Sequence, residues 1–180
     1  MKIPDEKLVE AYLKGDKRAL EILIKRYLKA IYNFAYRYVG KEEAEDVTQE
    51  VFLKMWRNLK KFKKEKNFKS WLWTIARNAC FDFLRKKRRS QVWYLEDLSS
   101  LPDSRSLPYE ALEKEGLKEK LEEAIKSLPF KMRQILNLYY KEGLNFREIA
   151  ETLNESLNTI KSRHRRALKE IKKLLSEEDF

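Results

Sequence analysis

The sequence predicts an all-α fold in which two small helical domains are joined by an extended linker. Apolar residues recur at helical spacing over most of the chain, and glycine or capping residues bound the periodic stretches. The periodicity fails in one acidic segment that contains proline and serine. Within the 180 residues we therefore expect a first domain at 1–89, a linker at 90–116 and a second domain at 117–180.

Four helical stretches make up the predicted first domain. A short one covers residues 8–13, and Asp16 then caps a long one that Gly40 ends. The next begins near Glu42, and the last begins at Ser70 as its N-cap. Their apolar residues should form the core of a bundle: Leu20, Leu23, Ile24, Tyr27, Ile31, Phe34, Ala35, Tyr38, Ala44, Val47, Val51, Met55, Leu59, Phe62, Leu72, Ile75, Ala76, Ala79 and Phe83.

The linker prediction depends on composition. Pro102 and Pro108 stand among serines and acids, and residues 96–123 carry nine acids against four bases. So long a structureless connection is uncommon inside a compact domain, so a linker is favoured over a packed loop.

The second predicted domain contains a helix-turn-helix. A helix begins near Leu117, and another ends at Gly143. Asn145 can then cap a short helix over 146–153, and a three-residue turn leads to a longer helix from near Asn158. On that last helix we expect core contacts from Ile160, Ala167, Leu168 and Ile171, and outward side chains at Lys161, Ser162, Arg165, Arg166 and Lys169.

The net charge of +11 is concentrated in one segment. Residues 54–89 carry fourteen Lys and Arg against only Glu65 and Asp82. Such an asymmetry indicates a surface that binds a polyanion such as nucleic acid.

Several classes of protein are excluded by composition. No apolar run is long enough to span a membrane and no signal peptide is present, so we expect a cytoplasmic protein. Cys80 and His164 are the single members of their residue types, which excludes an internal disulfide and a zinc cluster. No phosphate-binding glycine loop or nucleophile elbow occurs, so we expect no catalytic residues, no metal and no cofactor.

A mixed polar and apolar stripe follows the second long helical stretch. Acids at its start complement the helix dipole, but Asp46, Gln49 and Glu50 lie further along. They share a polar face with Leu53 and Trp56. We interpret this stripe as a surface that binds a protein partner rather than as a merely solvated face.

Aromatic residues alternate with lysine in KKFKKEKNFK and the helix after it. This pattern suits single-stranded DNA, since bases stack on exposed rings and lysine neutralises phosphates. For Phe62 we favour core packing; Phe68 and Trp71 fit core packing or base stacking equally well. Trp73, Arg77 and Asn78 should keep partial freedom, and the run from Arg85 to Arg89 exceeds what a helix dipole requires.

Three motifs follow one another along the chain: DVTQEVF, WLWTIARN and the block from SLPF to IKSRHRRALKEIKKLL. Together and in this order they resemble the extracytoplasmic-function group (group IV) of the sigma-70 family of bacterial sigma factors. The resemblance covers nearly the whole chain except the linker. It implies that 1–89 is sigma region 2, that 117–180 is sigma region 4, and that the protein gives promoter specificity to core RNA polymerase without being an enzyme.

The resemblance also implies which residues meet each partner. Polymerase-binding residues would be Asp46, Gln49, Glu50, Leu53 and Trp56. The first domain would read and melt the minus-ten element and capture a flipped base of the non-template strand. The residues that would meet this element are Lys61, Lys63, Lys64, Lys66, Asn67, Phe68, Lys69, Trp71, Trp73, Arg77, Asn78, Arg85 and Lys86. Duplex DNA of the minus-35 element would meet Asn158, Thr159, Lys161, Ser162, Arg163, Arg165 and Arg166. An anti-sigma factor is a further implied partner.

The chain departs from the family pattern in its last two helices. Asn154 and Asn158 stand where the family usually has Gly, a change that Asn tolerates because it adopts left-handed backbone and caps helices. Glu155, His164 and Arg165 replace residues that are commonly apolar or aromatic. We expect His164 to be a neutral residue at the surface or groove edge.

Other functions remain as alternatives. A helix-turn-helix regulator should bind duplex DNA alone and carry a dimer or effector region, which we do not find. A single-strand or RNA chaperone leaves the helix-turn-helix unexplained, and a nuclease needs a metal or nucleophile site that we cannot assemble.

Overall fold

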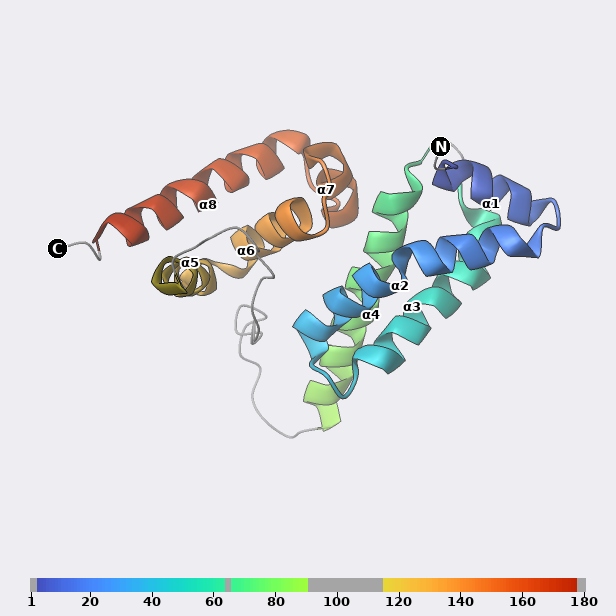
Figure 1. Cartoon of the computed structure of the whole chain (residues 1–180), viewed down its shortest axis with the longest axis horizontal. Helices are drawn as coiled ribbons and strands as arrows, with labels where there is room; N and C mark the ends of the chain where they lie inside the picture. The colour runs from blue at the N-terminus through green and yellow to red at the C-terminus, as the bar shows by residue number, and fades with distance from the viewer. Residues whose placement is uncertain (1–2, 64–65, 91–114, 178–180) are drawn as a thin grey trace. The chain divides into compact units, whose positions relative to one another are not determined.

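The computed structural model describes residues 3–63, 66–90 and 115–177 (Figure 1). All regular elements of these ranges are helical, and the chain divides into two compact units, Met1–Leu95 and Glu96–Phe180. The predicted all-α class with two helical domains is confirmed. Most of the predicted linker, from residue 91 to 114, lies outside the described residues. No helix within those ranges is long and apolar enough to cross a membrane.

The described part of the first unit is a helical bundle. It contains α1 (Asp5–Leu13), α2 (Lys17–Val39), α3 (Ala44–Asn58), the 3₁₀ helix η1 (Leu59–Lys61) and α4 (Phe68–Ser90). Helix α4 packs against both α2 and α3, and α1 packs along α2 (Figure 1). Each long helix contributes fully buried side chains to one core, among them Leu23, Ile31, Phe34, Val51, Met55, Leu72 and Ala76.

The ends of α2 follow from local chemistry, as predicted. The Asp16 carboxylate accepts a 3.0 Å hydrogen bond from the backbone N–H of Arg18, which satisfies a donor of the first turn. Gly40 ends the helix at φ 92°, a conformation that side chains with a Cβ rarely adopt.

Helix α4 begins three residues earlier than predicted. Asn67, not Ser70, caps it: the Asn67 Oδ1 accepts from the backbone N–H of Ser70 at 2.9 Å. Ser70 itself is buried within the first turn. Asn67 is exposed and Ser70 is buried, so the cap forms at the residue outside the core, a choice that the sequence analysis did not foresee.

The second unit carries the helix-turn-helix. Its described elements are α5 (Glu115–Ser127), α6 (Phe130–Leu136), the π-helical turn η3 (Asn137–Lys141), α7 (Phe146–Leu153) and α8 (Leu157–Glu177). Ala124 of α5 and Leu128, which directly follows that helix, pack with Leu136 of α6 and with Ala167 and Ile171 of α8.

The prediction that Leu168 faces this core is wrong, because 42% of its surface is exposed. Consecutive residues of a helix are separated by about 100° around its axis, so Leu168 turns away when Ala167 points inward.

Candidate protein and nucleic-acid interfaces

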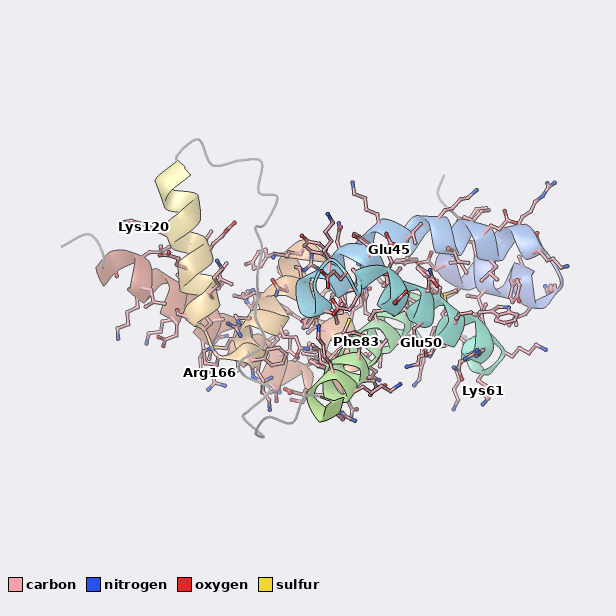
Figure 2. The ribbon with its side chains drawn as sticks, turned by 90° about the horizontal axis from the view of Figure 1, so that it is seen from below. Glu45, Glu50, Lys61, Phe83, Lys120 and Arg166 are labelled. Carbon is pink, nitrogen blue, oxygen red and sulfur yellow. The ribbon has the colours of Figure 1, made fainter. Side chains whose placement is uncertain are left out.

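The predicted stripe on α3 is an exposed surface. Asp46, Gln49, Leu53 and Trp56 lie on the outer side of the helix, with Leu53 42% and Trp56 51% exposed. Glu50 is partly covered, and its carboxylate lies 3.5 Å from the Lys54 ammonium. Figure 2 shows Glu45 and Glu50 along this helix. Two large apolar side chains flanked by acids suit a protein partner better than water.

Helix α1 supports this stripe through a contact that the sequence analysis missed. The Trp56 indole Nε1 donates a 2.7 Å hydrogen bond to the Tyr12 hydroxyl. Leu13, beside Tyr12, is also exposed. The two partners are 44 positions apart, so helical periodicity offers no signal that joins them.

A cationic loop connects η1 to α4. Lys61 at the end of η1 and Lys63, Lys66 and Asn67 of the loop are exposed, and Lys64 lies outside the described residues. Figure 2 shows Lys61 extending from the end of η1. The loop is anchored at both ends by core residues, since Phe62 before it is buried, as predicted, and so is Phe68 after it. Exposed ammonium groups on such a loop suit phosphate binding.

Two aromatic residues of the predicted minus-ten site are core residues instead. Phe68 is 0% and Trp73 is 1% exposed, so neither ring is available to a base in this structure. Trp73 packs on Phe34 with ring centroids 5.1 Å apart. The error arose because α4 packs against two helices, which buries a wider arc of its surface than a helix resting on one neighbour would.

Trp71 keeps a partly exposed ring. Its indole packs against Phe62 at 5.1 Å and Phe68 at 5.7 Å between ring centroids. These two rings cover part of the indole, and the rest of Trp71 stays accessible to solvent. Among the three aromatic residues of α4 that we predicted to meet DNA, it is the one whose position permits stacking.

The outer face of α4 continues the cationic surface. Asn78, Arg85 and Lys86 are exposed, and Lys69 is partly exposed. Arg77 is partly buried, and its guanidinium lies 4.9 Å from the centre of the Phe81 ring. A cation held over a ring is fixed in direction, and the sequence analysis did not single out Phe81.

The helix-turn-helix is built as the sequence predicts. The Asn145 side chain accepts from the N–H of Glu148, and the Glu148 carboxylate accepts from the N–H of Asn145, a capping box at the start of α7. Asn154 ends α7 at φ 53° and ψ 46°, a left-handed conformation. Asn adopts this conformation more readily than most other residues with a side chain, so it can stand here in place of Gly. The Ser156 Oγ accepts from the Thr159 N–H at the start of α8.

The first turns of α8 present polar and cationic side chains. Asn158, Lys161, Ser162, Arg165 and Arg166 are exposed and Thr159 is partly exposed, as expected of a helix that enters a DNA groove (Figure 2 labels Arg166). Ile160, between Thr159 and Lys161 but on the other side of the helix, is fully buried. The buried side of α8 therefore fixes its orientation in the domain, and its polar side faces solvent.

Arg163 departs from the predicted DNA-binding set. Its guanidinium lies 2.6 Å from the Glu155 carboxylate, and its side chain is only 15% exposed. Glu155 lies in the turn, so this pair joins the turn to α8. In this structure the charge of Arg163 is therefore paired inside the protein rather than open to a phosphate.

His164 belongs to an aromatic cluster rather than to a groove edge. Its ring lies 5.0 to 5.8 Å from those of Tyr139, Tyr140 and Phe146. Burial lowers the pKa of His164 below its usual value of 6.5, which favours the neutral ring that we expected.

Two family models match the chain. The model of sigma-70 region 2 matches residues 23–90, and the model of sigma-70 region 4 matches residues 124–173. The first range spans most of α2 through α4, and the second runs from the end of α5 through most of α8.

Curated relatives are similar over nearly their whole length. The ECF RNA polymerase sigma factor SigW of Bacillus subtilis is 32% identical, across 97% of this chain and 98% of the relative. The RNA polymerase sigma-H factor of Pseudomonas aeruginosa is 32% identical, across 95% and 93%. The ECF RNA polymerase sigma-E factor of Haemophilus influenzae is 31% identical across 92% of both.

Solved structures share the fold. The structure of CnrH in complex with the cytosolic domain of CnrY aligns with a TM-score of 0.69 at 21% identity, covering 96% of this chain and 97% of that one. The sigma factor RpoE of Bartonella quintana, in complex with the anti-sigma factor NepR, aligns with a TM-score of 0.64 at 27% identity, covering 87% and 96%.

Proposed function

The chain belongs to the extracytoplasmic-function group of sigma-70 factors, and from that premise we propose which of its surfaces meets each partner. As a sigma factor it is a transcription initiation factor and not an enzyme. It binds core RNA polymerase and directs initiation at specific promoters. Its first domain recognises and melts the minus-ten element, and its helix-turn-helix reads the minus-35 element.

Core polymerase binds the stripe of Asp46, Gln49, Glu50, Leu53 and Trp56. The observation that supports this assignment is the exposure of Leu53 and Trp56 beside carboxylates on one helical face, while the opposite face of α3 is buried. Apolar side chains supply the area that becomes buried in the complex, and the acids select a basic partner surface.

The minus-ten element binds the cationic loop and the outer face of α4. Lys61, Lys63, Lys66 and Lys69 neutralise phosphates of the non-template strand, and the partly exposed Trp71 ring offers a surface for an unstacked base. Unstacking a base costs a few kcal/mol, which contacts to the flipped base offset. The exposed Asn78, Arg85 and Lys86 extend the phosphate contacts along the helix.

The minus-35 element binds the exposed side of α8. Lys161, Arg165 and Arg166 are long cations on the first turns of the second helix of a helix-turn-helix, where phosphate and base-edge contacts are made together. Ser162, Asn158 and Thr159 complete this surface, and Arg163 holds the turn instead of DNA.

An anti-sigma factor is the remaining proposed partner. RpoE of Bartonella quintana was solved with one, and this chain shares its fold over most of both lengths. Such a partner would cover the exposed stripe of α3 and keep the protein from polymerase. We place the protein in the cytoplasm, where it meets polymerase.

The test is run-off transcription with bacterial core RNA polymerase over a randomised promoter library. The wild type is compared with the triple variant Asp46→Ala, Gln49→Ala, Glu50→Ala. A matched control, Glu21→Ala, Asn33→Ala, Glu123→Ala, removes the same charge and the same amide at exposed positions outside the stripe.

We expect specific transcripts from the wild type and the control, and loss of polymerase binding by the folded stripe variant. The enriched promoters would then supply the two recognition sequences. Wild-type protein that ignores core polymerase but binds duplex DNA alone would point to a helix-turn-helix regulator instead.

A further inference from the structure

The backbone at the start of α4 is held by a side chain from the other end of the domain. The Glu6 Oε1 of α1 accepts a 3.0 Å hydrogen bond from the backbone N–H of Phe68. The two residues are 62 positions apart, and the bond is partly buried. First-turn N–H groups of a helix have no partner within the helix, so an external carboxylate is an effective acceptor for this one.

The segment that carries Glu6 is itself held by hydrogen bonds to α2. Its neighbour Asp5 accepts hydrogen bonds from the Tyr27 hydroxyl and the Arg26 guanidinium, and Arg26 also donates to the Ile3 carbonyl at 2.9 Å. The side chains of Arg26 and Asp5 are 13% and 16% exposed. The start of α1 is thus tied to α2, which gives Glu6 a rigid base.

The other partner, Phe68, closes the cationic loop. Its ring lies 5.9 Å from Tyr27 and 5.7 Å from Phe62, which stands at the opposite end of the loop. Asn67, directly before it, caps α4. The Glu6 bond therefore acts at the joint where the loop with Lys63 and Lys66 turns into the helix that carries Trp71.

We infer that Glu6 is a positioning residue for promoter melting: by holding the Phe68 N–H, it fixes the cationic loop and the Trp71 ring relative to each other. The inference rests on the proposed assignment of the minus-ten element to this loop. Glu6 lies in the first turn of α1, whereas Tyr12, the α1 residue that contacts Trp56 of the stripe, lies in its last turn. Loss of Glu6 should affect DNA melting and leave docking on polymerase intact, because only the loop joint loses its anchor.

The experiment uses the full chain and three variants. Glu6→Ala removes the acceptor, whereas Glu6→Gln keeps an oxygen that can accept the same bond. Glu21→Ala is the matched control, since it removes an exposed carboxylate from α2. Three quantities are measured: the amide chemical shift and hydrogen exchange of Phe68, the affinity for core polymerase, and the rate of open-complex formation on duplex and on pre-melted promoter DNA.

We expect Glu6→Ala to speed exchange of the Phe68 amide and to slow open-complex formation on duplex DNA about tenfold, the effect of one lost charged hydrogen bond. Polymerase affinity should stay at the wild-type value, and pre-melted DNA should restore much of the loss. Glu6→Gln and the control should behave like the wild type. If Glu6→Ala fails to fold, Glu6→Asp, which withdraws the carboxylate by one methylene, should show the same pattern more weakly.

Normal melting by a folded variant whose Phe68 amide has lost protection would overturn the inference. So would a loss of polymerase affinity that parallels the loss of melting, because Glu6 would then only support the fold. A wild-type protein that forms no open complex with polymerase would refute the proposed function. The amide measurement would still report on the Glu6 bond, so the two failures are distinguishable.

Discussion

Arg163 of the second helix-turn-helix helix pairs with Glu155 of the turn before it, at 2.6 Å between guanidinium and carboxylate. Glu155 occupies a position where the sequence departs from an apolar family pattern. The pair shows how this chain accommodates an acid there: the carboxylate enters a partly buried ion pair that joins the turn to the start of α8.

This pair predicts that Glu155→Ala and Arg163→Ala each weaken binding to minus-35 duplex DNA in the holoenzyme by a similar, modest factor. The double variant should lose little more DNA affinity than either single variant, because each single substitution already removes the ion pair. Arg166→Ala is the contrast, because an exposed phosphate-binding cation should lower affinity and reduce the salt dependence. A loss for Arg163→Ala that far exceeds that for Glu155→Ala would show that Arg163 contacts DNA.

The hydrogen bond from Trp56 to Tyr12 predicts that Tyr12→Phe weakens binding to core polymerase. The change removes one hydroxyl, which lets the exposed indole rotate away from its docking orientation. We expect a loss of about fivefold, in line with one neutral hydrogen bond. Titration of labelled core polymerase measures it, and Tyr12→Phe should have no effect when Trp56 is already Phe.

Because Phe68 is buried, we expect its substitution to lower stability, whereas substitution of an exposed lysine of the loop should weaken DNA binding. Phe68→Ala should lower the free energy of unfolding by about 3 to 5 kcal/mol, because it empties a packed site between Tyr27 and Phe62. Lys63→Ala should change it by less than about 0.5 kcal/mol yet reduce DNA affinity at low salt. Urea unfolding of both variants, with promoter binding alongside, checks the contrast.

Cys80 should be unreactive in the folded protein. Burial raises the pKa of its thiol to about 12, so almost no thiolate exists at neutral or mildly alkaline pH. A thiol reagent at pH 8 should modify the native chain only as fast as it opens, and at once in denaturant. Rapid native labelling would show that the core around Cys80 opens readily.

The bond between Lys87 and Glu43 predicts a specific pH dependence. The Lys87 ammonium donates to the Glu43 carboxylate and lowers the pKa of Glu43 below its ordinary value. A depressed carboxyl pKa stabilises the fold above the unfolded-state pKa and ceases to do so as pH falls through the folded value. In Lys87→Met the free energy of unfolding should therefore fall less steeply as the pH drops below about 5 than in the wild type. Lys86→Met, which changes the exposed neighbouring residue, should leave this pH dependence unchanged.

Much of the fold could be predicted because its signals are local. Asp16 and Asn145 cap their helices, Gly40 ends α2, and the turn before α8 has the predicted place. The exposed stripe on α3 and the cations of α8 also follow from helical spacing, since one element alone decides which side of it is polar.

The sequence by itself determined the helices, their ends, the concentration of positive charge and the family to which the motifs belong. Only the tertiary structure decided that Phe68 and Trp73 are core residues, because the buried arc of α4 depends on how many helices pack against it. Likewise, the bond from Glu6 to Phe68 joins segments 62 positions apart whose meeting no periodic pattern encodes. Long-range contacts depend on how the elements pack, and that packing is a property of the whole domain.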